Sequence, residues 1–497
     1  MGQYLERGAG ILFHISSVPS PYGIGTFGKE AYKVVDKIAE AKQKYWQVLP
    51  LGPTSYGDSP YASFSAFAGN PYFIDLDMLI EEGLLTKAYV ESFKWNYEED
   101  IVDFGTIYNY RFEVLKTAFE KSEHKDTEEY TEFVSKNEYW LNDYALYMAC
   151  KNHFDNVCWQ EWDDDIKFRT EKGIEKYESL LETEVDFWKF LQFKFFEQWK
   201  ELKEYANEKG IKVIGDIPIY VALDSADVWV NTELFQMDEE LNPKKVAGVP
   251  PDAFSALGQR WGNPLYDWKK MEKTDFKWWR NRMKAQAELY DIIRIDHFIG
   301  IVTYYTIPAE DEDARNGKYE KGPGMKLIKA INESVGDKKI IAEDLGVLIP
   351  EVEKVLEKSG YPGMKVLEFA FDGNRKNSHL PYFWTQNTVA YGGTHDNDTL
   401  MGYYSALQPW ELGYIKEYLK VQNGSLEDIV DELFRTAYAS VADVVIFQMQ
   451  DVLKIGNKGR MNLPSSMGTN WRWRMTKDMF GEKEIERLRY LCDIYGR

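Results

Sequence analysis

The sequence predicts an α/β fold, a (β/α)8 TIM barrel with helical insertions, and two patterns lead to it. Short apolar runs end in polar or glycine-rich turns, as expected of parallel strands that are buried on both faces. Helical patterns separate several of these runs, and 497 residues suffice for one large barrel. The predicted strands are Gly10–Ser16, Trp46–Leu51, Val213–Tyr220, Ile292–Asp296, Ile340–Asp344, Val366–Phe371, Val389–Thr394 and Val444–Met449.

The helices are predicted from the spacing of apolar residues between these strands. Lys29–Ala41, Trp278–Tyr290 and Glu351–Lys358 each show a helical pattern. Residues from about 80 to 200, between the second and third strands, form longer aromatic-rich segments such as Phe187–Tyr205. We therefore predict one barrel unit over residues 1–497, with a helical insertion at about 80–200.

Charge and composition limit the possible partners. The net charge of −21 repels phosphate backbones and anionic membrane surfaces, so we expect neither nucleic acid nor a membrane as partner. A hydrophobic content of 44% and a charged content of 28% are ordinary for a globular protein. Aromatic residues reach 15%, and most of them belong to the core, although exposed rings also suit sugar binding.

The cysteines and the N-terminus bear on location. Cys150, Cys158 and Cys492 give neither a disulfide framework nor the spacing of metal ligands, which favours a reducing compartment. The first residues, Met1 to Arg7, lack an apolar signal core, and no stretch reaches the roughly 20 apolar residues of a membrane span. We expect a soluble cytoplasmic protein that is a monomer or a weak homodimer.

Acidic residues stand at or just after the C-terminal ends of four predicted strands: Asp216, Asp296, the pair Glu343 and Asp344, and Asp396. In a (β/α)8 barrel these ends converge on one face, where catalytic sites lie. Each acid taken alone is more simply explained as the cap of a following helix. The set favours a shared site, because Asp296, Glu343 and Asp396 each have another unusual polar residue beside them.

Arg294 lies two residues before Asp296, and positions i and i+2 of a strand point to the same face. An inward arginine would keep that carboxylate ionised and oriented, which suits a nucleophile. His297 follows Asp296, and His395 precedes Asp396. One buried histidine is usually structural, but two beside strand-end acids are more suggestive of a site.

Retaining glycoside chemistry needs two such carboxyl groups with different pKa values. One attacks the anomeric carbon as a carboxylate, and the other protonates the leaving oxygen as an acid. Arg294 would lower the pKa of Asp296, and the like charge of Asp344 would raise that of Glu343.

Three segments then resemble the catalytic-strand motifs of the amylomaltases. These are 4-α-glucanotransferases, or disproportionating enzymes, related to the α-amylases. The three segments are Arg294–Phe298, Ala342–Gly346 and Thr394–Asn397. Further matches cover essentially the whole chain, at Tyr56–Tyr61, Gly248–Asp252, Gly258–Pro264 and Asn470–Arg474.

The resemblance implies a role for each matched residue. Asp296 would be the nucleophile, Glu343 the acid/base, and Asp396 the residue that stabilises the transition state together with His395. Residues from about 242 to 265 would form a lid-like loop over the glucan, although their proline and glycine content also fits a rigid surface turn. The implied substrate-binding residues are Arg294, His297, His395, Asp216, Tyr61, Ser59, Tyr56, Asp252, Gln259, Trp261 and Asn470.

The implied activity is transfer of an α-1,4-glucan segment to glucose or a maltooligosaccharide, through a covalent glycosyl-aspartate, without metal or cofactor. The segment Arg460–Gly468 departs from the family pattern, which puts the acceptor side in doubt. Two other classes of protein stay open. A barrel enzyme could use the same acids to bind magnesium, although Arg294 beside Asp296 opposes that. A non-catalytic sugar-binding relative would have to lack one of the three acids, and all three are present.

Overall fold

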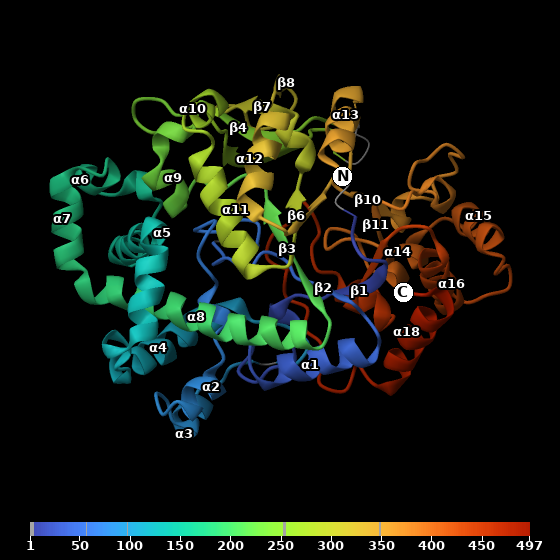
Figure 1. Ribbon diagram of the computed structural model, residues 1–497, viewed down its shortest axis with the longest axis horizontal. Coiled ribbons are helices and arrows are strands. Elements are labelled where there is room, and N and C mark those ends of the chain that lie inside the picture. The colour runs from blue at the N-terminus through green and yellow to red at the C-terminus, as the bar shows by residue number, and fades with distance from the viewer. Residues whose placement is uncertain (1–3, 56, 97, 252–254, 347–348) are drawn as a thin grey trace.

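The computed structural model describes residues 4–55, 57–96, 98–251, 255–346 and 349–497. Its central element is an eight-stranded sheet with the strand order β10-β11-β12-β1-β2-β3-β6-β9, in which all paired neighbours run parallel (Figure 1). The predicted (β/α)8 barrel is confirmed. The strands are β1 (Gly8–Leu12), β2 (Tyr45–Gln47), β3 (Lys212–Pro218), β6 (Ile292–Asp296), β9 (Lys339–Ala342), β10 (Gly363–Val366), β11 (Thr388–Tyr391) and β12 (Val444–Gln448).

Two hydrogen bonds connect β9 to β10 and nearly close the barrel. The Ala342 N–H donates to the Pro362 carbonyl oxygen at 3.0 Å. The Met364 N–H donates to Oδ1 of Asp344 at 2.7 Å. Asp344 therefore has a structural contact of its own at this seam, beside the predicted catalytic glutamate.

The predicted strand over Val366–Phe371 is wrong in position. Strand β10 ends at Val366, and Leu367–Phe369 form a 3-10 turn. Gly363 and Lys365 interrupt the apolar run at its true start, and burial of Leu367 in the turn extends the run past its true end. Apolar content reports burial in both elements, so it cannot separate a strand from the turn that follows it.

The strands separate two apolar cores. Alternate residues such as Ile214, Ile292 and Ile446 fill the barrel interior. Their sequence neighbours, such as Val213 and Ile293, face outward and pack beneath the helices. This period of two follows from strand geometry and directs Asp216, Arg294 and Asp296 inward with the first set.

The outer helices cover the barrel through one apolar face each. In α1 (Lys29–Glu40) the buried residues Ala31, Val34, Val35 and Ile38 repeat with helical spacing. The three helices predicted around the barrel are present with ends that differ by one residue. The remaining helices near the barrel are α11 (Lys277–Leu289), α12 (Met325–Val335), α13 (Pro350–Ser359), α14 (Leu400–Ala406), α15 (Pro409–Leu419), α16 (Leu426–Ala439), α17 (Met449–Val452) and α18 (Glu482–Tyr495).

Helices also fill the long interval between β2 and β3, and they gather at one side of the molecule (Figure 1). The two longest, α5 and α8, pack against each other and bury Leu141, Tyr144, Phe190 and Leu191. Among the described residues, no helix is long and apolar enough to cross a membrane. The helices of this interval are α2 (Leu76–Glu81), α3 (Lys87–Glu91), α4 (Phe104–Lys121), α5 (Glu128–His153), α6 (Asp164–Lys167), α7 (Glu171–Leu180) and α8 (Glu182–Glu208).

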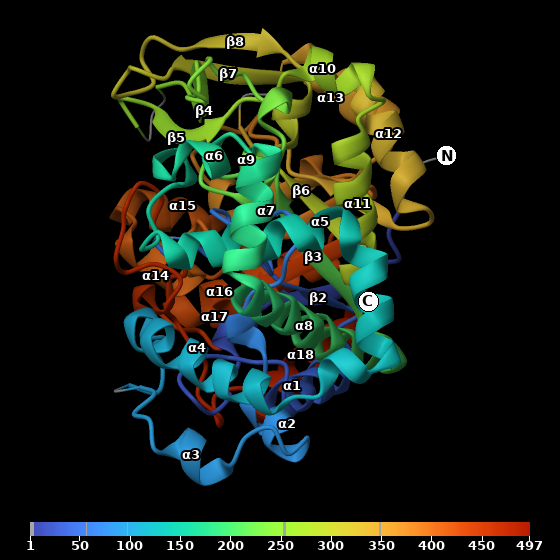
Figure 2. The ribbon, with the colours of Figure 1, turned by 90° about the vertical axis from the view of Figure 1, so that its left-hand side faces the viewer.

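A second, antiparallel sheet with the order β5-β4-β7-β8 lies at one end of the molecule (Figure 2). Its strands are β4 (Lys245–Val249), β5 (Gln259–Pro264), β7 (Thr303–Pro308) and β8 (Lys318–Lys321), and the short helices α9 (Ala226–Val230) and α10 (Trp268–Lys273) flank β4 and β5 in sequence. The segment predicted as a lid-like loop therefore contains two paired strands. Gly248 allows these strands to pair closely, since a Cβ there would lie 2.2 Å from the Gln259 carbonyl oxygen.

Candidate active site

The first part of the site is an ion-paired row across β3 and β6. Asp216 lies directly opposite Arg294 in the strand register. Nη1 of Arg294 lies 2.6 Å from both carboxylate oxygens of Asp216 and 3.0 Å from Oδ1 of Asp296. The structure thus places Arg294 and Asp296 on one face, as their spacing predicts. Arg294 and Asp216 are almost fully buried, at 3% and 1% exposure, whereas Asp296 is partly open.

Glu343 follows β9 and is held by main-chain donors. Its Oε2 accepts the N–H of His297 at 2.7 Å, and its Oε1 accepts the N–H of Leu345 at 2.7 Å. His297 has a left-handed backbone with φ of 52°, an uncommon conformation for a residue other than glycine. That turn after Asp296 directs the His297 N–H at the carboxyl group of Glu343.

The two carboxyl groups differ in pKa in the direction that retaining chemistry needs. Burial raises the pKa of Glu343 to about 8, and the charge of Asp296 adds to this rise. Burial also raises the pKa of Asp296 to about 6, while Arg294 acts in the lowering direction. The expected effect of Arg294 is therefore present but smaller than burial. Asp344, predicted as the cause of the high pKa of Glu343, contributes less than burial and Asp296.

Asp396 lies on the more open side of the site, with half of its side chain exposed. Nδ2 of Asn462 donates to its Oδ1 at 2.6 Å, and Nη2 of Arg460 donates to its main-chain oxygen at 2.8 Å. Nε2 of His395 lies 3.3 Å from the same carboxylate. Sequence reasoning missed Asn462 and Arg460. The only signal was that they fall in the segment that departs from the family pattern.

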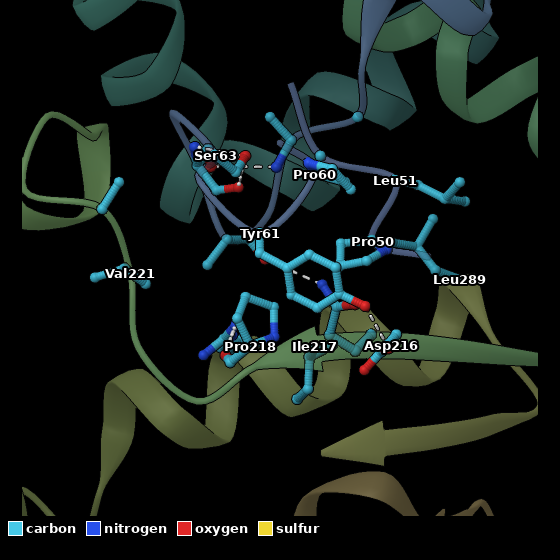
Figure 3. A pocket seen from close by; sticks show the side chains of 18 of the residues that line it. Pro50, Leu51, Pro60, Tyr61, Ser63, Asp216, Ile217, Pro218, Val221 and Leu289 are labelled. Atoms are coloured by element: carbon cyan, nitrogen blue, oxygen red, sulfur yellow. Dashed lines mark hydrogen bonds between the residues drawn. The ribbon is translucent and has the colours of Figure 1, made fainter. Parts of the chain in front are cut away.

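Tyr61 joins the two sides of the site. Its hydroxyl donates to Oδ2 of Asp216 at 2.8 Å (Figure 3). The same hydroxyl lies 3.2 Å from Nδ1 of His395. The Tyr61 and His395 rings stack at 4.6 Å, and Trp471 packs against both. Oγ of Ser59 accepts the Tyr61 N–H at 3.2 Å, so Ser59 orients Tyr61.

The predicted lid contributes an aromatic side chain beside the turn that follows Asp296. The Trp261 ring meets the His297 ring edge to face at 4.9 Å. Nε1 of Trp261 donates to Oε1 of Gln259 at 3.1 Å, and Trp261 is 38% exposed. Tyr56 and Asp252, which the resemblance also assigns to the site, lie outside the described residues.

The side-chain amide of Asn470 forms its hydrogen bonds within its own turn of the chain. Its Oδ1 accepts the N–H of Leu463 at 3.0 Å, and its Nδ2 donates to the carbonyl of Ser466 at 2.9 Å. It thereby orders the turn between Leu463 and Asn470, and the predicted sugar contact would require these bonds to change. In the part of the chain that the structure describes, no group of three or more His, Cys, Asp or Glu side chains is arranged to hold a metal ion.

Arg294→Met should lower the free energy of unfolding by about 3–5 kcal/mol, because Asp216 would stay buried without its cation. Urea unfolding followed by circular dichroism measures the change. Adding Asp216→Asn to the same protein should restore part of the loss, since the unpaired charge is then gone. An Arg294→Met protein as stable as wild type would contradict the view that this ion pair is needed.

Comparison with known proteins agrees with these features. A family model described as 4-alpha-glucanotransferase, glycoside hydrolase family 77, matches residues 13–479. The 4-alpha-glucanotransferase of Clostridium butyricum is 48% identical over 486 residues, which are 97% of this chain and 99% of that protein. The structure of the amylomaltase from Streptococcus agalactiae in complex with acarbose is 41% identical and covers 99% of this chain and 100% of its own, with a TM-score of 0.95. The amylomaltase from Corynebacterium glutamicum, at 18% identity, shares the fold with a TM-score of 0.77 over 98% of this chain and 75% of its own.

These matches confirm the resemblance to the amylomaltases. The chain belongs to the 4-α-glucanotransferases of glycoside hydrolase family 77, retaining transferases that act on α-glucans.

Proposed function

We propose that this enzyme transfers a segment of an α-1,4-glucan to glucose or a maltooligosaccharide by double displacement through a covalent bond to Asp296. One observation carries the proposal: burial and the charge of Asp296 raise the pKa of Glu343 above that of Asp296. At a pH between these values, Asp296 is a carboxylate and Glu343 is an acid. That is the pair of states with which a retaining reaction starts.

In the first step, Asp296 attacks the anomeric carbon while Glu343 gives its proton to the glycosidic oxygen. The bond between that carbon and that oxygen breaks, and the shortened glucan leaves with the proton. As the Asp296 charge is consumed, Arg294 stays paired with Asp216, so the buried cation keeps a partner. The main-chain N–H groups of His297 and Leu345 then stabilise the Glu343 carboxylate that remains.

In the second step, the Glu343 carboxylate takes a proton from an acceptor hydroxyl, whose oxygen attacks the anomeric carbon and releases Asp296. Asp396 and His395 would hydrogen-bond the hydroxyls of the reacting sugar more strongly as its ring distorts. Asn462 and Arg460 position Asp396 for this contact, since both donate to it.

Water competes with the acceptor sugar for the same intermediate. Trp261 on β5 lies against His297, next to the nucleophile, and could stack with a sugar while excluding water. We propose that the hairpin of β4 and β5 acts as the lid. The free cysteines Cys150, Cys158 and Cys492 further support a cytoplasmic location.

Trp261→Ala should lower the ratio of transfer to hydrolysis by roughly 2- to 10-fold, the worth of one aromatic contact of about 0.5–1.5 kcal/mol. Product chromatography with maltotriose measures the transfer products, and the increase in reducing ends measures hydrolysis. Trp410→Ala, an exposed tryptophan on α15, is a suitable control and should leave the ratio unchanged. An unchanged ratio in Trp261→Ala would count against the lid.

The function is tested by incubating the purified protein with maltotriose, with and without a chelator, and separating the products. Glucose together with a ladder of longer maltooligosaccharides, unaffected by the chelator, is the expected result. Shorter sugars alone would indicate a hydrolase with the same catalytic residues. Loss of turnover in chelator would favour the magnesium-dependent alternative.

A further inference from the structure

Glu368 is a buried acid beside the turn that carries His395 and Asp396. It lies in the 3-10 turn after β10 and is 4% exposed. Its N–H donates to the Gly392 carbonyl oxygen at 3.2 Å. Its carboxyl group packs so closely on Gly393 that a Cβ there would lie 2.8 Å from Oε1. Glu368 therefore contacts the two residues that join β11 to the turn.

Asn397 closes this turn and connects it to Glu368. Oδ1 of Asn397 accepts the N–H of Thr394 at 2.8 Å and the hydroxyl of the same residue at 2.9 Å. The Asn397 N–H donates to the Thr394 carbonyl oxygen at 3.1 Å. The side-chain amide of Asn397 also acts on the Glu368 carboxyl group as a hydrogen-bond donor. The side chain that fixes both ends of the turn is thus supported by Glu368.

The surroundings of Glu368 favour an uncharged carboxyl group. Burial raises its pKa well above the usual value, the charge of Asp451 adds to this rise, and the lowering effect of Arg460 is smaller than either. Its Oε1 is buried and has no hydrogen-bond partner among the described residues. A buried carboxylate in this state is costly, whereas the neutral acid is tolerated. The other titratable groups around it are also acids: Asp398, Tyr403 and Tyr404.

We propose that protonated Glu368 is a positioning residue for the turn that carries His395 and Asp396. A neutral carboxyl group can accept the Asn397 amide without bringing a charge into this region. The support reaches the two site residues through the closed turn, because Glu368 holds Asn397 and the start of the turn together. The proposal rests on the proposed roles of His395 and Asp396 in transfer.

The pH dependence of stability tests the charge state of Glu368. A glutamate in an unfolded chain ionises at about pH 4.3, so above roughly pH 5 the folded protein keeps a proton that the unfolded chain has released. Stability should therefore fall as the pH rises, and this one group should raise the unfolding equilibrium constant by about tenfold per pH unit.

Urea unfolding between about pH 6 and 7 measures this slope. Glu368→Gln should lose the part of the slope that comes from Glu368, since glutamine binds no proton. Glu357→Gln, which replaces an exposed glutamate on α13, should keep the wild-type slope and serves as the control. Equal slopes in wild type and Glu368→Gln would overturn the protonated state.

Transfer from maltotriose tests the positioning. Glu368→Leu keeps the bulk of the side chain but offers Asn397 no acceptor. We expect kcat to fall by roughly 10- to 100-fold with KM little changed, because a misplaced turn weakens contacts made in the transition state. Glu368→Gln should restore kcat to near the wild-type value, since its amide oxygen accepts the same bond.

Asn397→Ala removes the same link from its other side, so it remains informative even where Glu368→Leu does not fold. The double variant should be no slower than Asn397→Ala, because the two changes act through one contact. Additive losses, or a folded Glu368→Leu protein with the wild-type kcat, would overturn the positioning role. Failure of the proposed function would instead appear as absent transfer in wild type, while the unfolding slopes still decide the charge state of Glu368.

Discussion

Asp296→Asn should reduce transfer from maltotriose by roughly 10⁴- to 10⁶-fold, as expected when a catalytic nucleophile is removed. Asparagine has nearly the same shape but cannot form the covalent intermediate. The fold should be kept, because Arg294 retains both of its contacts with Asp216. Initial rates of glucose release, with the melting temperature as a check on folding, measure the effect.

Asp344→Asn is the matched control. Asp344 is also buried at the end of a barrel strand, but its Oδ1 accepts the Met364 N–H at the seam between β9 and β10. We expect this variant to lose some stability and less than about tenfold in rate, since an asparagine oxygen can accept the same bond. Transfer at the wild-type rate in Asp296→Asn would rule out Asp296 as the nucleophile.

The core of the site was predictable because strand geometry constrains it. An acid two residues after Arg294 must share its face, and acids at the ends of parallel strands must meet at one edge of the barrel. The structure accordingly places Asp216, Arg294 and Asp296 in contact. Local sequence was enough here, because each residue needed only its own strand to be placed.

The contacts that support Asp396 were not predictable, because they join residues that lie far apart in the sequence. Asn462 reaches Asp396 from 66 residues along the chain, after one further strand and several helices. No local spacing encodes such a contact. The pairing of β4 with β7 across about 60 residues escaped prediction in the same way. The sizes of the pKa shifts also depend on burial, which is a property of the assembled site.

Glu343→Gln should slow transfer from maltotriose by roughly 10²- to 10⁴-fold, the usual worth of a general acid/base. An α-glucosyl fluoride donor should largely escape this loss in the first step, because fluoride leaves without a proton. Glutamine cannot activate the acceptor, so the glycosyl-enzyme should accumulate. Mass spectrometry of a proteolytic digest should then find the sugar on the peptide that contains Asp296. No adduct should form in Asp296→Asn.

The pH dependence separates this role of Glu343 from a structural one. In wild type, kcat/KM should rise as Asp296 ionises at about pH 6 and fall as Glu343 loses its proton at about pH 8. Glutamine has no proton to lose, so the fall above pH 8 should vanish in Glu343→Gln while the rise near pH 6 stays. Since Asp296 raises the pKa of Glu343 by its charge, the pKa of Glu343, followed by NMR, should be lower in Asp296→Asn than in wild type. An alkaline limb that persists unchanged in Glu343→Gln would assign the proton to another group.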